Sequence, residues 1–62
     1  MKAAIYTMTA EEYRGWNSDD GYELYAMRTK VERLARSKYP CSPGVDICAP
    51  DGHRVTWICD AD

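Results

Sequence analysis

Hydrophobic and polar residues alternate most clearly in the last third of the chain, where one turn signal interrupts the alternation. Pro50-Asp51-Gly52 matches a type I turn followed by a left-handed glycine that forms a bulge. This three-residue loop predicts a β-hairpin over Val45–Cys59, because a two-residue Asp-Gly turn would mix apolar and polar residues on both faces. The predicted register pairs Ala49 with His53, Ile47 with Val55, and Val45 with Trp57. The apolar side chains of the hairpin then share one face.

The beginning of the chain predicts a short strand followed by a helix start. Lys2–Met8 is moderately apolar and contains residues that favour extended backbone. Thr9 and Glu12 have the spacing of a capping box, in which each side chain accepts a hydrogen bond from the other residue's backbone N–H. We therefore expect a short helix over Ala10–Arg14, with Gly15 just beyond its end.

A longer helix is predicted from Gly21 to Ser37 or Lys38. Asp20 and Glu23 have the spacing that caps a helix start, with Ser18 or Asp19 as competing caps, and Pro40 ends the helix. The apolar residues of this segment fall in one arc of about 100°, the width expected for a helix laid on a sheet. They are Leu24, Met27, Val31, Leu34 and Ala35.

Together these elements predict a single small α+β domain over residues 1–62, in the order β-α-α-β-β. We expect a three-stranded antiparallel sheet in which the last strand lies between the other two. The long helix should pack on one face of this sheet, beside the short extra helix. Residues 60–62 are expected to fray.

The length and composition limit the classes of function. A chain of 62 residues leaves no room for a buried active-site cleft, so we expect a protein that is not an enzyme and needs no cofactor. The start of the chain lacks the apolar segment of a signal peptide, and no stretch has the length of a membrane span. These features favour a cytoplasmic protein that does not enter membranes.

Candidate chemistry is sparse. Cys41, Cys48, His53 and Cys59 are residue types that bind zinc, but their spacing is poor and the predicted register places Cys48 and Cys59 on opposite faces of the hairpin. We therefore expect no metal site and reduced cysteines. Asp51 follows the turn proline near His53, but turn aspartates usually bond their own backbone, so we predict no catalytic residues.

Charge is segregated along the chain although its net value is only −2. Five acids and one base lie between Glu11 and Glu23, whereas five bases and one acid lie between Arg28 and Lys38. The acids suit helix starts, and mimicry of nucleic-acid phosphate would need a larger acidic excess. The basic segment either complements the helix dipole and solvates the helix or forms a binding face with two tyrosines, since Tyr and Arg are enriched at binding hot spots. The predicted partner-binding residues are Tyr22, Tyr25, Lys30, Arg33, Arg36 and Lys38.

The two tryptophans are assigned differently. Trp57 fits the apolar face of the predicted hairpin, which makes it a core residue. Trp16 lies in a predicted loop, where it either covers the edge of the core or forms an exposed contact. The sequence leaves this choice open.

Four segments carry a resemblance to a known group of proteins: Met1-Lys2-Ala3-Ala4, Leu34-Ala35-Arg36-Ser37-Lys38, Cys41, and the strand led by Gly44. They resemble small phage-encoded anti-CRISPR proteins of the type I-F inhibitor group. The resemblance implies a helix on a small antiparallel sheet that presents basic residues to a Cas surveillance complex, with Lys30, Arg33, Arg36 and Lys38 as contacts in the host cytoplasm. The acidic stretch Glu11–Asp20 departs from this pattern.

The functional hypothesis is a small inhibitor or adaptor, from a phage or mobile element, that docks the basic and aromatic helix face onto a larger protein or ribonucleoprotein complex. The alternative is direct nucleic-acid binding through the same face, which would be strongly salt-dependent. The chain is expected to be a monomer or a homodimer, because an exposed outer strand could pair with a second copy.

Overall fold

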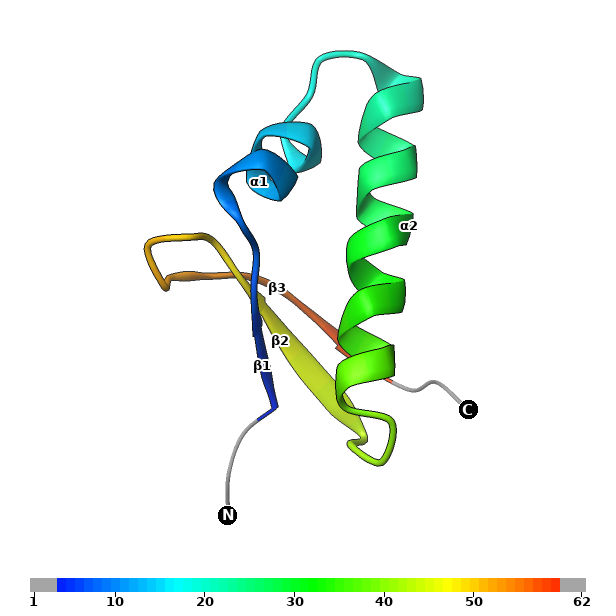
Figure 1. Ribbon diagram of the computed structural model, residues 1–62, viewed down its shortest axis with the longest axis vertical. Helices are drawn as coiled ribbons and strands as arrows, with labels where there is room; N and C mark the ends of the chain where they lie inside the picture. Colours follow the sequence, from blue (N-terminus) through cyan, green and yellow to red (C-terminus); the bar gives the residue numbers. More distant parts are fainter. Residues whose placement is uncertain (1–3, 60–62) are drawn as a thin grey trace.

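The computed structural model describes residues 4–59 and confirms the α+β class and the order of the elements. Figure 1 shows a strand, two helices and a final hairpin. Their bounds are β1 Ile5–Thr7, α1 Ala10–Trp16, α2 Gly21–Lys38, β2 Gly44–Cys48 and β3 Arg54–Cys59. The predicted tail at residues 60–62, and the first two residues of the predicted strand Lys2–Met8, lie outside the described residues.

The sheet of the described residues is mixed, and β2 is its central strand. The order is β1-β2-β3, with β1 parallel to β2 and β2 antiparallel to β3. The prediction of a wholly antiparallel sheet with the last strand in the middle was therefore wrong. The chain returns from β1 to β2 through both helices, and such a crossover connection is what a parallel neighbour requires.

The hairpin turn forms as predicted. Gly52 has a φ of 101°, and its N–H donates to the Ala49 carbonyl at 2.8 Å. The Ala49 N–H donates to the His53 carbonyl at 2.9 Å, so the first predicted pair is confirmed.

Beyond this pair the predicted register was wrong by one residue. A bulge in the ladder places Cys48 opposite Arg54 but Ile47 opposite Thr56, so that β3 accommodates one extra residue. Val45 consequently faces Ile58, and Asp46 faces Trp57. The shift turns Trp57 away from the core, and its side chain is 55% exposed.

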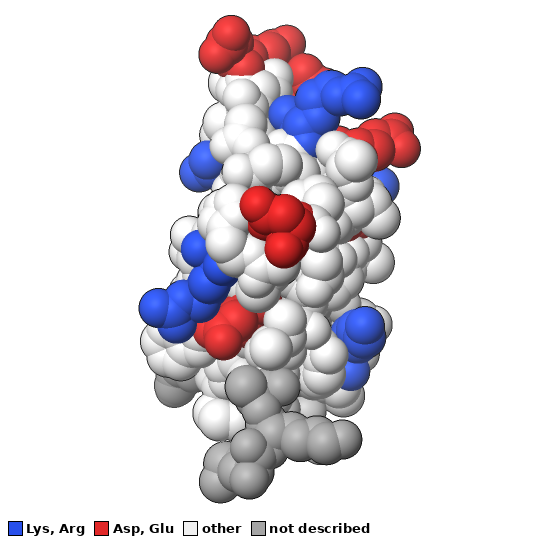
Figure 2. Space-filling view, turned by 90° about the vertical axis from the view of Figure 1, so that its left-hand side faces the viewer, with Lys and Arg blue, Asp and Glu red and all other residues white. Residues whose placement is uncertain are grey.

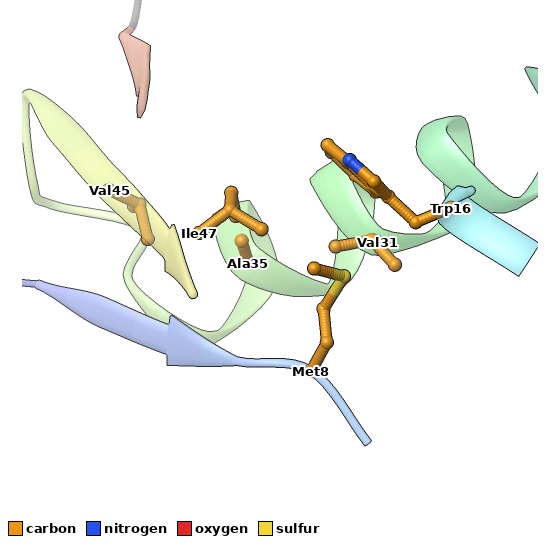
Figure 3. Close-up of a cluster of buried hydrophobic side chains, with 6 residues drawn as sticks. All are labelled: Met8, Trp16, Val31, Ala35, Val45 and Ile47. Carbon is orange, nitrogen blue, oxygen red and sulfur yellow. The ribbon is translucent and has the colours of Figure 1, made fainter. Parts of the chain in front are cut away.

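The core lies between the sheet and α2. Val45 and Ile47 of β2 are fully buried, as are Val31 and Ala35 of α2. Full burial of a valine or isoleucine side chain typically contributes about 1.5–3 kcal/mol, so Val31, Val45 and Ile47 carry much of the stability of a small domain. Leu34 was predicted to lie in this core but is 38% exposed. Figure 3 shows the cluster of Met8, Trp16, Val31, Ala35, Val45 and Ile47.

The helix starts are capped as the sequence predicts, with one difference in detail. Thr9 Oγ1 accepts from the Glu12 N–H at 3.1 Å, and Glu12 Oε1 accepts from the Thr9 N–H at 3.0 Å. Asp20 caps α2 by accepting from the Tyr22 N–H at 3.0 Å, whereas Glu23 accepts from the Ser18 hydroxyl instead of reaching back to the cap. The Thr9 cap fixes the junction between β1 and α1, whereas the Asp20 cap and the Ser18–Glu23 hydrogen bond hold the short connection between α1 and α2.

Helix α1 runs two residues further than predicted. Gly15 is inside the helix and is buried against Met27 of α2, and a Cβ at Gly15 would lie only 2.9 Å from Met27 Cγ. The close approach of the two helices brings Trp16 into the core, where its side chain is 4% exposed. The open question about Trp16 is thereby settled in favour of a core position.

Candidate binding surface on helix α2

The solvent-facing side of α2 carries two tyrosines whose side chains are largely exposed. Tyr22 is 83% exposed and Tyr25 is 69% exposed, the two highest values among the exposed large hydrophobic residues. Both lie in the first turns of an 18-residue helix whose buried residues, Val31 and Ala35, are on the opposite side. Tyrosine has a large apolar ring, so this degree of exposure leaves an apolar patch on the surface.

Arg33 extends this patch toward the end of the helix. At about 100° per residue, Tyr22, Tyr25, Arg33 and Arg36 fall within an arc of about 80°. Arg33 is exposed and takes part in no hydrogen bond or ion pair within residues 4–59. Lys30 is also exposed, at the flank of the arc, about 80° from Tyr22. We call Tyr22, Tyr25, Lys30 and Arg33 the outer face of α2.

The other two predicted contact residues are placed differently. Arg36 is half-buried, and its Nη1 donates to the Ser42 carbonyl at 3.4 Å, so it holds the connection that follows the helix. Lys38 lies about 160° around the helix from Tyr22, and its Nζ lies 5.7 Å from the centroid of the Tyr39 ring. The structure therefore leaves four of the six predicted residues exposed on the outer face, while Arg36 lies in the same arc but contacts the connection after the helix, and Lys38 points elsewhere.

The charge pattern is mixed and does not form a continuous basic surface. Glu23 and Glu32 are exposed on α2, where Glu23 precedes the basic residues and Glu32 lies between Lys30 and Arg33. Figure 2 shows the side of the molecule away from α2, where acidic and basic side chains are interspersed. A nucleic-acid site normally presents a basic patch or stripe. The outer face of α2 instead combines aromatic surface with two cations.

His53 and Asp51 form the closest approach to catalytic geometry among the described residues. Asp51 Oδ1 lies 2.6 Å from His53 Nδ1 and also accepts from the His53 N–H at 3.1 Å. The backbone N–H of His53, together with its ring, lowers the pKa of Asp51 below its usual range. The ring of His53 meets Tyr13 edge-on, with a centroid distance of 6.4 Å. These contacts order the hairpin turn against α1, and the side chains of His53 and Asp51 are both largely exposed to solvent.

The cysteines are free and dispersed. Cys41 and Cys59 are exposed, whereas Cys48 is buried. The predicted separation of Cys48 and Cys59 rested on the wrong register: Cys59 pairs with Gly44, at the opposite end of β2 from Cys48. Distance along the strands therefore keeps the two thiols apart. Within residues 4–59, no group of three or more His, Cys, Asp or Glu side chains is placed to hold a metal ion.

A buried carboxylate beneath α1 is structural. Glu12 is 9% exposed, and its two carboxylate oxygens accept from the Tyr6 hydroxyl at 3.0 and 3.1 Å. Partial burial raises the pKa of Tyr6, and the hydrogen bond and negative charge of Glu12 raise it further. The Tyr6 hydroxyl and the Thr9 N–H together supply the Glu12 carboxylate with hydrogen-bond donors, and the bond from Tyr6 connects β1 to α1.

The sheet face opposite α2 carries two apolar residues, Ile5 and Trp57, and Trp57 was predicted to lie in the core. Ile5, Asp46 and Trp57 lie in one row across the three strands, and Ile5 is 44% exposed. The Trp57 ring covers Gly44, because a Cβ at Gly44 would lie 2.6 Å from Trp57 Cζ2. Alternation alone could not reveal this row, since a single extra residue in β3 reverses which side chains face the core.

No protein-family model, curated protein or solved structure matches the chain. Across the part of the chain that the structure describes, no helix combines the length and apolar character needed to cross a membrane.

Proposed function

We propose that the protein is a small non-enzymatic binding protein that docks the outer face of α2 onto a larger protein. The observation that carries the proposal is the exposure of Tyr22 and Tyr25, at 83% and 69%, beside Arg33 and Lys30 on one side of a long, rigid helix. Aromatic residues and arginine are enriched where protein interfaces concentrate their binding energy. A face that served solubility alone would not require two tyrosines.

The chemistry of the outer face defines the partner. Two tyrosine rings at the start of the face require a shallow apolar groove, and their hydroxyl groups can reach polar atoms at its rim. Arg33 can fork onto a carboxylate about two to three turns further along the helix. We therefore propose that the partner presents an apolar groove bordered by acidic side chains, recognised as a helix in a groove.

The resemblance to small anti-CRISPR proteins supplies a specific version of this proposal. In that version the partner is a CRISPR surveillance complex, and the protein acts as an inhibitor encoded by a phage or mobile element. Inhibition would follow if the outer face of α2 occupied a surface that the complex needs for target binding. This version supplies the first partner to test.

The test compares three variants in recovery of the surveillance complex, or of another partner, from a bacterial lysate. The double variant Tyr22→Ala/Tyr25→Ala and the variant Arg33→Glu should each reduce recovery about tenfold or more, as expected for hot-spot residues. Lys38→Glu makes the same charge change as Arg33→Glu but lies off the outer face, so it should bind like the wild type. Equal recovery by Arg33→Glu and the wild type, or equal losses for Arg33→Glu and Lys38→Glu, would contradict the proposal.

The dependence of binding affinity on salt concentration distinguishes a nucleic-acid partner from a protein partner. If the retained partner is DNA or RNA, log affinity should fall steeply with log salt concentration in proportion to the phosphates contacted. The exposed cations of the outer face are Lys30 and Arg33, and their number supports only a shallow dependence. Retention of a nuclease-sensitive partner that is lost at moderate salt would replace the protein-binding proposal with the nucleic-acid alternative.

A further inference from the structure

The outer edge of β3 has the properties of a pairing edge. The order β1-β2-β3 leaves one side of β3 without a neighbouring strand in residues 4–59. The Asp46 N–H donates to the Ala4 carbonyl at 2.8 Å, so the backbone groups of Asp46 point toward β1. Its antiparallel partner Trp57 is therefore not hydrogen-bonded to β2, and the Trp57 N–H and carbonyl point outward. By the two-residue period of a strand, those of Cys59 point the same way.

The two edges of the sheet differ in how they are protected. The β1 edge is three residues long, and the Tyr39 hydroxyl donates to the Ile5 carbonyl at 2.7 Å, which occupies one acceptor there. Beyond Arg54, β3 contains only Val55-Thr56-Trp57-Ile58-Cys59, without a charge or a proline. Natural edge strands are usually blunted by such residues, and this segment has high β-propensity. The unprotected edge is long enough to accept another strand.

We propose that β3 pairs with β3 of a second copy of this chain, in an antiparallel arrangement around a two-fold axis. The bulge at the start of β3 limits regular pairing to Thr56–Cys59. A symmetric register that uses both outward residues places Trp57 opposite Cys59 of the second copy, with Ile58 on the axis. The product is a continuous sheet across two copies, and an isologous contact of this kind closes as a dimer.

Charge complementarity favours a second copy of this chain as the partner that pairs with the β3 edge. Antiparallel pairing brings the start of one β3, where Arg54 stands, toward the end of the other, where the sequence continues as Asp60-Ala61-Asp62. The Arg54 side chain is 65% exposed, and its one ion pair within the described residues, with Asp46, is 3.5 Å long. It is therefore available to the acids that follow Cys59 in the sequence of a second copy. The same strand supplies both ends, so the edge is complementary to itself.

Sedimentation measured over a range of protein concentrations tests the pairing. The wild type should show a reversible monomer–dimer equilibrium. Trp57→Pro removes the outward N–H and should raise the dimer dissociation constant about tenfold or more, whereas Trp57→Thr keeps this N–H and should change it far less. Circular dichroism verifies that both variants remain folded. A wild type that stays monomeric at all concentrations would overturn the proposal, as would species larger than a dimer or equal dissociation constants for the two variants.

A crosslinking experiment tests the register without relying on a proline. In a Cys41→Ser background, Trp57→Cys places a thiol opposite Cys59 of the second copy, at a Cα separation of about 5.5 Å that permits a disulfide. Mild oxidation should give a covalent dimer on a non-reducing gel. Thr56→Cys in the same background places the thiol on the other face of the strand and should remain monomeric. Equal crosslinking of the two variants, or none for Trp57→Cys, would overturn the proposed register.

This proposal is independent of the outer face of α2. Tyr22→Ala/Tyr25→Ala should leave the dimer dissociation constant unchanged, since the two tyrosines are on the helix and not on the sheet edge. Loss of the dimer in this variant would assign self-association to α2 and overturn pairing through β3.

Discussion

The guanidinium of Arg28 covers the ring of Trp16 and binds the same residue's backbone. The Arg28 Cζ lies 4.9 Å from the ring centroid, and Nε and Nη2 donate to the Trp16 carbonyl at 3.3 and 3.2 Å. Trp16 is the last residue of α1, where backbone carbonyls lack partners within the helix. Arg28 therefore satisfies the end of α1 and fixes it to α2, which removes Arg28 from the set of cations available to a partner.

Replacing Arg28 should destabilise the domain. We expect Arg28→Ala to lower the free energy of unfolding by about 1–3 kcal/mol, because it removes a charge-assisted hydrogen bond and a cation–π contact. Arg33→Ala removes an equal charge from an exposed position of the same helix and should change stability by less than about 0.5 kcal/mol. Urea unfolding of both variants measures the difference, and equal midpoints would contradict the structural role of Arg28.

Tyr6 should make the free energy of unfolding depend on pH in the alkaline range. Burial, followed by the hydrogen bond to Glu12 and the negative charge of Glu12, raises the pKa of Tyr6 above its ordinary value, so the folded state favours the protonated hydroxyl. The resulting stabilisation is complete below the unfolded pKa and is lost as pH rises through the higher folded pKa. Denaturant unfolding from about pH 8 to pH 11 should show stability falling at the upper end.

The Tyr6→Phe variant isolates this contribution. It keeps the ring but has no hydroxyl, so its stability should fall less steeply above about pH 10 than that of the wild type. Tyr25→Phe removes an exposed hydroxyl and should retain the wild-type slope. If the unfolding free energy of the wild type and of Tyr6→Phe fell equally steeply with pH, the contact with Glu12 would not raise the pKa of the Tyr6 hydroxyl.

The features that sequence predicts correctly are local. Thr9 with Glu12, Asp20 before the long helix, and Pro50-Asp51-Gly52 act within a few residues of one another, and the structure forms each of them as a cap or turn. Such features depend on backbone donors close in the chain and need no tertiary information. The α+β class follows from the order of these elements.

The strand order and the register depend on distant contacts. Whether β1 joins β2 or β3 is decided by packing between the helices and the sheet, which no spacing in the sequence encodes. On α2, helical periodicity alone groups Tyr22, Tyr25 and Arg33. It could not reveal that Arg36 reaches Ser42 in the connection after the helix.

Two glycines of the helices should respond in opposite directions to alanine. At Gly21 a Cβ would meet nothing within 4 Å, so Gly21→Ala should stabilise the domain by up to about 1 kcal/mol through helix propensity. At Gly15 the Cβ would lie 2.9 Å from both Cγ and Cε of Met27, inside the contact between the two helices. Gly15→Ala should therefore destabilise by about 1–3 kcal/mol despite its better propensity. Thermal unfolding of the two variants should move the midpoint in opposite directions, and a stabilised Gly15→Ala protein would contradict the close packing.

The two tryptophans offer a direct measurement of the hairpin register. With the bulge, Trp16 is 4% exposed and Trp57 is 55% exposed, whereas a regular ladder would bury Trp57. In Trp57→Phe the remaining Trp16 should emit at short wavelength and resist quenching by acrylamide. In Trp16→Phe the remaining Trp57 should emit at longer wavelength and be quenched readily. Both spectra should be taken at a concentration where the chain is monomeric, since pairing through β3 would shield Trp57.

Stability provides the second readout of the same relationship. Trp16→Phe removes volume from the closed cluster around Val31 and should cost about 1–3 kcal/mol, because the cavity cannot collapse completely. Trp57→Phe keeps an aromatic ring over Gly44 on an open face and should cost less than about 1 kcal/mol. Two results together would mean that the side chain at position 57 faces the core. Trp57→Phe would have to be the more destabilising substitution, and Trp16, which remains in that variant, would have to be quenched more readily than Trp57 in Trp16→Phe. That result would require Ile47 to pair with Val55, as the regular alternation of the sequence predicts, and would remove the bulge that turns Trp57 away from the core.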